Sequence, residues 1–292
     1  MIKILVTGSN GQLGTEIHEL STYYPQFDFI YTDVDSLDIT NSKELERFVD
    51  GHPVQYIVNC AAFTAVDKAE SEKHMANLLN YTAVKYLAEL SKKKNIRLIH
   101  ISSDYVYSGE SCTPYSEDHP TNPSSVYGQT KLNGDKEVLK SGTGLILRTS
   151  WLYSPYGNNF VKTMLKLGHE RKEINVVFDQ VGTPTYAHDL ANVILKIIDS
   201  FEEKNSNFVP GVFHFSNEGV CSWYDFAWEI MKMSSLRCKV NPIETKDFPT
   251  PVKRPSFSVL NKNKIKSTFG FGIPYWKDSL KDCMKRLGYE TK

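Results

Sequence analysis

The amino-acid sequence predicts an α/β protein with a doubly wound parallel sheet and a smaller C-terminal lobe that is partly interleaved with the sheet. Short apolar runs that resemble strands alternate with helical segments through the first half of the chain. This alternation is typical of a parallel sheet with right-handed crossovers. Glycines follow the first run at positions 8, 11 and 14, and after residue 150 the pattern becomes less regular. We therefore expect a larger domain over residues 1–150. The smaller lobe would lie mainly over residues 151–292, with some segments returning to the larger domain.

Length, charge and cysteine content exclude several classes of protein. The 292 residues can form one large domain, or a large and a small one. Lysine plus arginine balances aspartate plus glutamate at 34 each, so nucleic acid and membrane surfaces are not expected as partners. The apolar runs are shorter than the ~20 residues of a membrane helix, and the N-terminus lacks the form of a signal peptide. Five scattered cysteines without Cys-x-x-Cys spacing indicate reduced thiols and a cytoplasmic location.

The glycines after the first strand predict a binding site for a dinucleotide. Residues 2–6 form the apolar, β-branched run of a buried parallel strand, and a helical pattern begins near Gly11. Glycine permits a tight turn, close approach of a pyrophosphate to the backbone, and close packing of helix and strand. Amides at the start of the helix then face the phosphates. This arrangement predicts a Rossmann-type domain, and a tight turn without a ligand is the alternative.

An acidic residue at the end of the second strand bears on the choice of cofactor. Residues 27–33 form that strand. Asp33 lies roughly 20 residues after the glycines, where a carboxylate accepts hydrogen bonds from a ribose. Because a carboxylate repels a 2′-phosphate, Asp33 favours NAD over NADP. Asp35 is an alternative for this role, and either residue could instead cap a turn.

The next strands end in residues that suit a bound ligand. Residues 55–60 form a strand that ends in small residues. These allow a ligand to pass close to the sheet edge at which open α/β sheets bind ligands. Residues 96–103 form a strand that delivers Ser103 to the same edge, and a loop over residues 108–125 is expected to cover the site.

Tyr127 and Lys131 are the candidate catalytic pair. Side chains four residues apart on a helix lie one above the other. We expect the Lys131 ammonium to lie close to the phenol and to lower its pKa, which is near ~10 in an ordinary tyrosine. Such a tyrosine transfers a proton near neutral pH, as the reduction of a carbonyl requires, and Ser103 could hydrogen-bond the same oxygen. Taken alone, such a pair is more often two exposed residues on an amphipathic helix.

The remaining periodicities predict scaffold elements. A helix through residue 49 is expected, with Thr40 or Asn41 as its N-cap. Further helices are expected over residues 77–93, 158–168, 189–201 and 223–233, and strands over residues 144–151, 174–178 and 211–215. The elements after residue 150 would form the smaller lobe, which closes over a second ligand.

Several motifs in order resemble the extended short-chain dehydrogenase/reductase family and, within it, the dTDP-4-dehydrorhamnose reductases. The resemblance covers nearly the whole chain, and it rests on residues 7–14, 59–70, 102–107, 127–131, 148–151, 179–185 and 254–258. The Val-Asp-Lys-Ala-Glu and Arg-Thr-Ser-Trp segments are much more specific than the glycines. The resemblance implies that NADPH or NADH reduces the C4 ketone of dTDP-4-dehydro-L-rhamnose to give dTDP-L-rhamnose.

The resemblance also implies a role for each matching residue. Ser103, Tyr127 and Lys131 would form the catalytic triad, in which Tyr127 protonates the sugar oxygen and Lys131 holds the nicotinamide ribose. Besides Tyr127 and Lys131, the cofactor would contact Gly8, Asn10, Gly11, Gln12, Leu13, Asp33, Asp38, Ile39, Ala61, Ala62 and Thr64. The sugar nucleotide would contact Val66, Asp104, Tyr105, Trp151 and Arg254. Arg254 suits a pyrophosphate, although it could be a surface ion pair, and Trp151 could be a core residue.

Two departures from the family pattern narrow these expectations. Some members place a magnesium ion at a dimer interface through acidic residues, and Glu16 matches one of them. His188 and Asp189 stand where a Glu-Asp pair is usual, and an imidazole weakens a magnesium site. Bound magnesium is therefore not favoured, and a homodimer is left open. Tyr105 stands where related dehydratases have glutamate, which favours simple reduction over elimination.

Two alternatives remain at this point. The chain could reduce another nucleotide-linked 4-ketosugar, because the geometry of the pocket sets the stereochemistry of the product. It could also be a non-catalytic regulatory subunit, since the regulatory subunit of methionine adenosyltransferase shares this fold and resembles these reductases. The intact Ser103, Tyr127 and Lys131 argue against a purely regulatory role.

Overall fold

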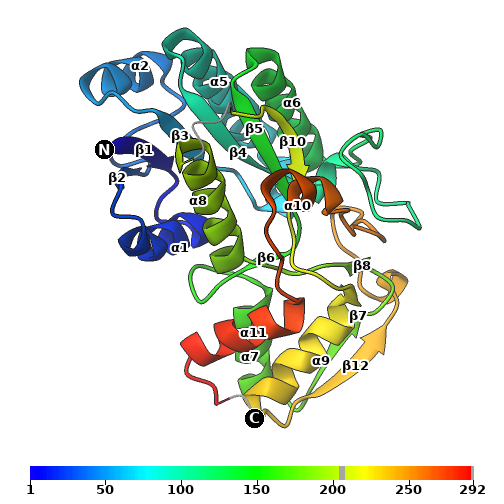
Figure 1. Cartoon of the computed structure of the whole chain (residues 1–292). Helices are drawn as coiled ribbons and strands as arrows, with labels where there is room; N and C mark the ends of the chain where they lie inside the picture. The colour runs from blue at the N-terminus through cyan, green and yellow to red at the C-terminus, as the bar shows by residue number, and fades with distance from the viewer. Residues whose placement is uncertain (204–207, 291–292) are drawn as a thin grey trace.

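A six-stranded parallel sheet forms the centre of the larger part of the molecule (Figure 1). The structure is a computed structural model that describes residues 1–203 and 208–290. The strands lie in the order β10 (Gly211–His214), β5 (Gly144–Thr149), β4 (Arg97–Ser103), β3 (Tyr56–Asn59), β1 (Ile2–Thr7) and β2 (Phe27–Thr32). Helices cover both faces of this sheet, so the predicted doubly wound Rossmann-type fold is confirmed.

Parallel pairing brings the ends of all these strands to one edge. Thr7 at the end of β1 pairs with Asn59 at the end of β3, and Ser103 at the end of β4 pairs with Thr149 at the end of β5. The strands are apolar and largely buried because helices pack on both sides. Polar residues therefore cluster at the carboxyl edge, where the apolar runs stop.

Two apolar cores, one on each face, hold the helices to the sheet. One face carries α1 (Gln12–Leu20) and α8 (Ala187–Glu203), together with α10 (Asn263–Phe269). The other face carries α2 (Ser42–Gly51), α5 (Ala83–Lys94) and α6 (Val126–Ser141). Asn41 is the cap of α2, since its side chain accepts a hydrogen bond from the Glu44 amide. This result decides between the two predicted caps.

The helix expected over residues 77–93 differs from the prediction. Helical structure begins earlier, in α3 (Val66–Ser71) and α4 (Lys73–Asn77), and a π-helical turn (Leu78–Thr82) precedes α5. Within that turn the buried Asn80 side chain accepts from the Phe63 amide at 2.9 Å and donates to the Phe63 carbonyl at 3.0 Å. The widened turn thus directs a polar side chain toward the loop after β3. Apolar periodicity does not reveal such a polar contact.

The second, smaller group of elements lies below the sheet in Figure 1. It contains α7 (Phe160–Glu170), α9 (Trp223–Ser234) and α11 (Trp276–Arg286), with β7 (Glu173–Val177) paired to β12 (Lys239–Ile243). Short two-residue strands connect this group to the sheet: β6 (Leu152–Tyr153), β8 (Val181–Gly182), β9 (Thr185–Tyr186) and β11 (Cys221–Ser222). The predicted elements after residue 150 are found within about two residues of their expected bounds. The chain passes repeatedly between the two groups, because α8, β10 and α10 belong to the sheet side.

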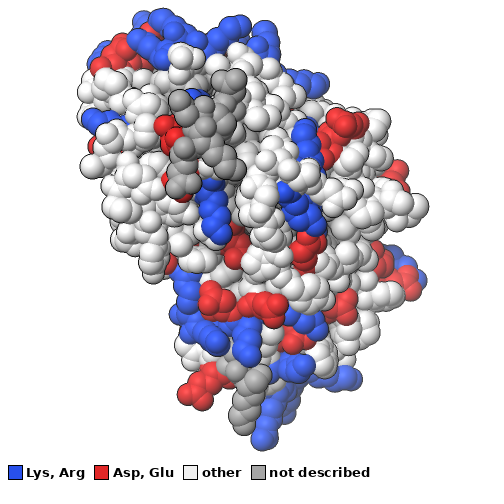
Figure 2. Space-filling model, in the orientation of Figure 1, with Lys and Arg blue, Asp and Glu red and all other residues white. Residues whose placement is uncertain are grey.

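The surface carries charges of both signs. Figure 2 shows lysine and arginine interspersed with aspartate and glutamate, with many of both over the lower group of elements. Within residues 1–203 and 208–290, no helix combines the length and the apolar character needed to cross a membrane.

Candidate active site

A cavity of about 610 Å³ lies at the carboxyl edge of the sheet and extends toward the lower group of elements. Its lining comes from the glycine loop, the ends of β3, β4 and β5, the start of α6, and residues of the lower group. A second cavity of about 590 Å³ shares Gly8, Gly11, Cys60 and Ala62 with the first. The two cavities therefore meet along the glycine loop, which leaves room for an extended ligand.

The cavities gather nearly all of the predicted site residues. The first is lined by Gly8, Gly11, Gln12, Leu13, Ala62, Thr64, Val66, Ser103, Asp104, Tyr105, Tyr127, Lys131, Trp151 and Arg254. The second is lined by Asp33, Asp38, Ile39 and Ala61, besides the shared residues. Asn10 lines neither cavity, and its backbone amide donates to the Asp33 carboxylate at 3.0 Å.

The glycine loop is built for close approach to the backbone. Gly8 has φ of +65°, and a Cβ added to it would lie 2.6 Å from the Ala61 nitrogen. A side chain at this position would therefore fill the space between the first and third strands, besides being strained. Helix α1 begins at Gln12, so its first amides point toward the cavity end of the loop. This geometry fits the phosphates of a dinucleotide.

Ser103 and Asp104 form a buried polar pair where β4 ends. The Ser103 hydroxyl donates to Asp104 Oδ1 at 2.9 Å and accepts from the Tyr105 amide at 3.2 Å. Asp104 Oδ2 is also buried and has no hydrogen-bond partner among the residues described by the structure. Burial raises the pKa of Asp104 to about 7, although the hydrogen bond from Ser103 acts in the opposite direction. This carboxyl can therefore change protonation state near neutral pH.

Tyr127 is held in the first turn of α6. The Ser125 side chain caps this helix by accepting from the Gly128 amide at 3.1 Å. Gly128 itself packs closely on the Tyr105 carbonyl, and the Tyr127 ring lies edge-on to the Tyr105 ring at a centroid distance of 5.4 Å. The phenol thus lies beside Ser103 at the end of β4.

Lys131 does not act on Tyr127 as we expected from the sequence. Its Nζ donates to the Ile101 carbonyl at 2.6 Å, and burial lowers the pKa of this lysine to about 8. Burial also raises the pKa of Tyr127, and a hydrogen bond with Ser103 only partly opposes that effect. The expected lowering of the tyrosine pKa is therefore wrong for this state, because desolvation of the phenolate dominates.

Two stacked indole rings line the first cavity. Trp151 lies on Trp223 with ring centroids 3.6 Å apart and planes 10° apart. Trp151 has a positive φ of +49°, which directs the chain out of β5 and into the lower group. Trp223 is the first residue of α9, whose start is fixed by a capping box between Ser222 and Asp225. Trp151 is therefore a cavity residue as well as part of the packing.

Arg254 also lines the first cavity and is already paired. Its guanidinium forms an ion pair with Asp67 and donates to the Tyr105 hydroxyl at 3.2 Å. The predicted ion pair is thus present, and Arg254 also lines the first cavity. A fixed, partly buried guanidinium of this kind suits an anionic ligand group.

Sequence reasoning missed several lining residues, of which Trp223, Gln180, Asn158 and Ser258 belong to the lower group or its connections. Gln180 and Ser258 fall within the motifs on which the family resemblance rests, so the sequence could have indicated them as site residues. No local pattern marks Trp223, because its partner Trp151 is distant in the sequence.

Comparison with known proteins gives matches over the full length. The profile of a family described as RmlD substrate binding domain matches residues 2–289. A crystal structure described as a dTDP-4-dehydrorhamnose reductase from Clostridium acetobutylicum is 44% identical, with a TM-score of 0.93 over 98% of this chain and 100% of that chain. A dTDP-4-dehydrorhamnose reductase from Bacillus anthracis in complex with NADP is 36% identical, with a TM-score of 0.92 over 98% and 100%. A curated dTDP-4-dehydrorhamnose reductase from Aggregatibacter actinomycetemcomitans is 38% identical over 97% of this chain and 98% of its own length.

Proposed function

The chain belongs to the RmlD substrate binding domain family, as the resemblance predicted, and we propose that it reduces the ketone of a dTDP-linked sugar. The proposed reaction converts dTDP-4-dehydro-L-rhamnose into dTDP-L-rhamnose, with NADPH or NADH as the reductant. The observation that carries this proposal is the buried Tyr127, beside Ser103, in a cavity that continues to the glycine loop. The relatives named dTDP-4-dehydrorhamnose reductase support the choice of substrate.

The glycine loop would hold the dinucleotide. Gly8 leaves the space that a Cβ would fill, and the amides at the start of α1 face the phosphates. Asp38 and Ile39 line the second cavity and would contact the adenine, while Ala61, Ala62 and Thr64 line the path between the two cavities. A bound nicotinamide supplies the hydride for the carbonyl carbon.

Tyr127 would supply the proton that completes the reduction. Negative charge develops on the ketone oxygen as the carbon accepts hydride, and the tyrosine hydroxyl donates its proton to that oxygen. One hydride and one proton thus convert C=O to CH–OH, and a phenolate remains until solvent restores the proton. The raised pKa of Tyr127 keeps the hydroxyl protonated before the reaction, and the Ser103 hydroxyl orients the same oxygen. Lys131 would hold the nicotinamide ribose.

The remaining cavity residues would bind the sugar nucleotide. We assign the deoxysugar to the region of Val66, Asp104, Tyr105 and Trp151, all of which line the first cavity with the catalytic residues. Arg254 would contact the pyrophosphate. Its present pairing with Asp67 keeps the guanidinium in place until the anionic ligand arrives. In this arrangement residues 1–150 hold the dinucleotide, while Trp151 and Arg254 bring residues 151–292 to the sugar nucleotide beside Val66, Asp104 and Tyr105 of the larger domain.

Asp33 bears on the choice between NADH and NADPH. Its carboxylate accepts from the Asn10 amide at 3.0 Å and from the Val34 amide at 2.8 Å, so it stays beside the second cavity. A fixed negative charge there disfavours a 2′-phosphate, although the Bacillus anthracis relative was solved with NADP. Steady-state kinetics with each reductant will measure the preference, and a strong preference for NADPH would contradict the argument from Asp33.

A coupled assay tests the reaction. The purified protein is mixed with reduced dinucleotide and enzymatically prepared dTDP-4-dehydro-L-rhamnose, the absorbance of the nicotinamide is followed, and the product sugar is identified. Oxidation with dTDP-L-rhamnose as the product is expected. A different product sugar would indicate another 4-ketosugar reductase. Bound dinucleotide without turnover on any ketosugar would favour a regulatory subunit.

Two further expectations belong to this proposal. A cytoplasmic location is supported by five cysteines that form no disulfide, and cell fractionation tests it. We also propose a homodimer, and its test is the molar mass in solution by light scattering.

A further inference from the structure

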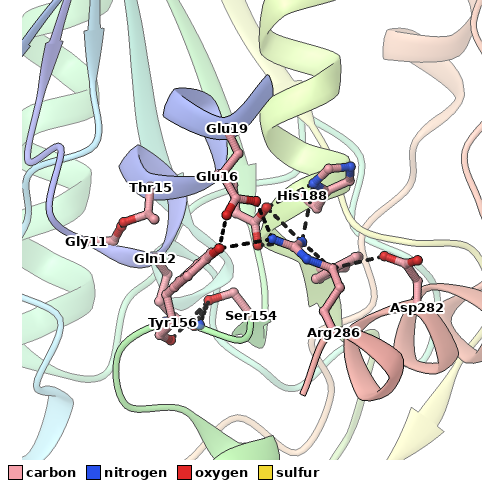
Figure 3. A network of polar contacts seen from close by, with 11 residues as sticks. Gly11, Gln12, Thr15, Glu16, Glu19, Ser154, Tyr156, His188, Asp282 and Arg286 are labelled. Carbon is pink, nitrogen blue, oxygen red and sulfur yellow. Dashed lines mark hydrogen bonds and ion pairs between the residues drawn. The ribbon is translucent and has the colours of Figure 1, made fainter. Parts of the chain in front are cut away.

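Arg286 lies in a polar network between the two groups of elements (Figure 3). It is the last residue of α11 in the lower group, and its side chain reaches Glu16 on α1 of the sheet side. Nη1 donates to both oxygens of Glu16, at 3.0 and 2.9 Å. Glu16 is fully buried, and a buried carboxylate is costly unless it is paired. The arginine therefore provides the positive charge that this position requires.

The same guanidinium reaches a loop that leads back to the cavity. Nη2 donates to Glu19 at 2.5 Å and to the Tyr156 hydroxyl at 3.3 Å. The Tyr156 hydroxyl also donates to Glu19, so the tyrosine is fixed by both partners. Tyr156 lies between β6 and α7, in a loop over residues 154–159, and Figure 3 shows its ring directed from this loop toward α1.

The loop over residues 154–159 in turn contacts the glycine loop region. Ser154 Oγ and Asn159 Nδ2 both donate to Gln12 Oε1, at 3.1 and 2.9 Å. Gln12 and Gly157 line the first cavity, and a Cβ on Gly157 would lie 3.2 Å from Gln12 Cγ. A continuous series of contacts thus joins Arg286, through Tyr156 and the loop, to a residue expected to contact the dinucleotide.

The residues around Glu16 do not fit magnesium, which the family resemblance raised as an option. Both Glu16 oxygens are taken by Arg286, and His188 Nδ1 lies 2.9 Å from Oε2. Asp189 Oδ2 accepts from Asn217 at 2.6 Å and from Ser279 at 2.5 Å. Magnesium requires an octahedron of oxygen ligands, and these oxygens already have partners from the chain itself.

We propose that Arg286 is a positioning residue for the dinucleotide, acting as an internal cation that ties α11 to α1 and holds the loop over residues 154–159 against Gln12. The inference rests on the proposed function, because it concerns the affinity for the reductant. Replacement of Arg286 should therefore weaken the binding of the dinucleotide and leave the proton transfer intact, since Tyr127 lies on α6, outside this series of contacts. The inference also makes dinucleotide binding independent of added magnesium.

Fluorescence titration with NADPH, in the absence of sugar nucleotide, tests the inference. Arg286→Met is expected to weaken binding about tenfold or more, which corresponds to the loss of a charged hydrogen bond, and Arg286→Lys to restore part of it. The KM for NADPH should rise in parallel, while kcat at saturating NADPH changes less than about threefold. Lys285→Met is the control, because Lys285 is an exposed neighbour on the same helix, and its affinity should be that of the wild type.

A second variant covers the case in which Arg286→Met does not fold. Tyr156→Phe keeps the Arg286–Glu16 pair and removes the hydroxyl by which the loop over residues 154–159 contacts Arg286 and Glu19, so a smaller loss of NADPH affinity is expected. The loss of NADPH binding free energy in the double variant should be smaller than the sum of the losses in the two single variants, because both residues act through one series of contacts. Wild-type affinity in folded Arg286→Met, or in Tyr156→Phe when the first variant is unfolded, would overturn the inference. So would tighter NADPH binding by the wild type in magnesium than in a chelator. Intact NADPH binding without ketosugar reduction would count against the proposed function alone.

Discussion

Replacement of Lys131 by methionine is expected to stabilise the unliganded protein at neutral pH while it removes activity. Burial lowers the pKa of this lysine from 10.5 to about 8, so the folded protein carries a charge at pH 7 that its surroundings disfavour. At about 1.4 kcal/mol per pH unit, the penalty is about 3 kcal/mol. Methionine also leaves the Ile101 carbonyl without its 2.6 Å partner, which costs about 1–2 kcal/mol. The net gain is therefore about 1–2 kcal/mol, or about 3 °C in Tm for a chain of this size.

Thermal denaturation of the unliganded protein measures this difference. Lys136→Met is the matched control, because Lys136 is exposed on the same helix and its replacement should leave Tm nearly unchanged. Turnover should be lost in Lys131→Met, since the proposed contact with the nicotinamide ribose is removed. A Tm below that of the wild type at pH 7 would refute the reasoning, because burial of the ammonium would then not be a net cost.

The pH dependence of the stability difference between Lys131→Met and the wild type tests independently whether the buried charge of Lys131 is destabilising. Between about 8 and 10.5 the unfolded state binds more protons at this lysine than the folded state does, so the stability of the wild type at this site rises with pH. The advantage of Lys131→Met should therefore be complete below pH 8 and should shrink as the pH approaches 10.5. An advantage that stays constant over this range would mean that the gain comes from packing and not from charge.

The remaining predictions concern the site itself. Tyr127→Phe should lower kcat about 10²- to 10⁴-fold and leave the Kd for NADPH nearly unchanged in a titration; near-normal turnover would remove Tyr127 from the proton transfer. Trp223→Ala removes the ring stacked on Trp151 at 3.6 Å, so KM for the sugar nucleotide should rise about tenfold, and an unchanged KM would mean that the stack does not shape the sugar site. Gly128→Ala places a Cβ 2.2 Å from the Tyr105 carbonyl oxygen, which must displace the first turn of α6. Both Tm and kcat should fall, the latter by about 10²-fold, and wild-type kinetics would show that the turn adapts.

The placement of Tyr127 and Lys131 and the shape of the glycine loop could be predicted because both are local. A spacing of four residues fixes Tyr127 and Lys131 on one side of a helix, and a strand followed by Gly8 and Gly11 determines the turn that opens the cavity. These relations depend on neighbouring residues only, so they survive without knowledge of the tertiary packing.

Other features depend on tertiary packing, and the sequence could not reveal them. The expected lowering of the Tyr127 pKa by Lys131 is wrong because the Ile101 carbonyl holds the ammonium. Burial of the phenol then raises the pKa of Tyr127. The contact of Arg286 with Glu16 joins residues 270 positions apart. No periodicity signals a contact of this separation.

The repeated passage of the chain between the two groups has a consequence for how these proteins can diverge or be recombined. β10 and α8 lie after residue 150, yet one completes the sheet and the other packs on α1. A chimera that takes residues 151–292 from a relative would therefore also import a sheet strand and half of a helical layer. Specificity for the sugar is more readily transplanted as scattered substitutions on a retained scaffold than as a contiguous cassette.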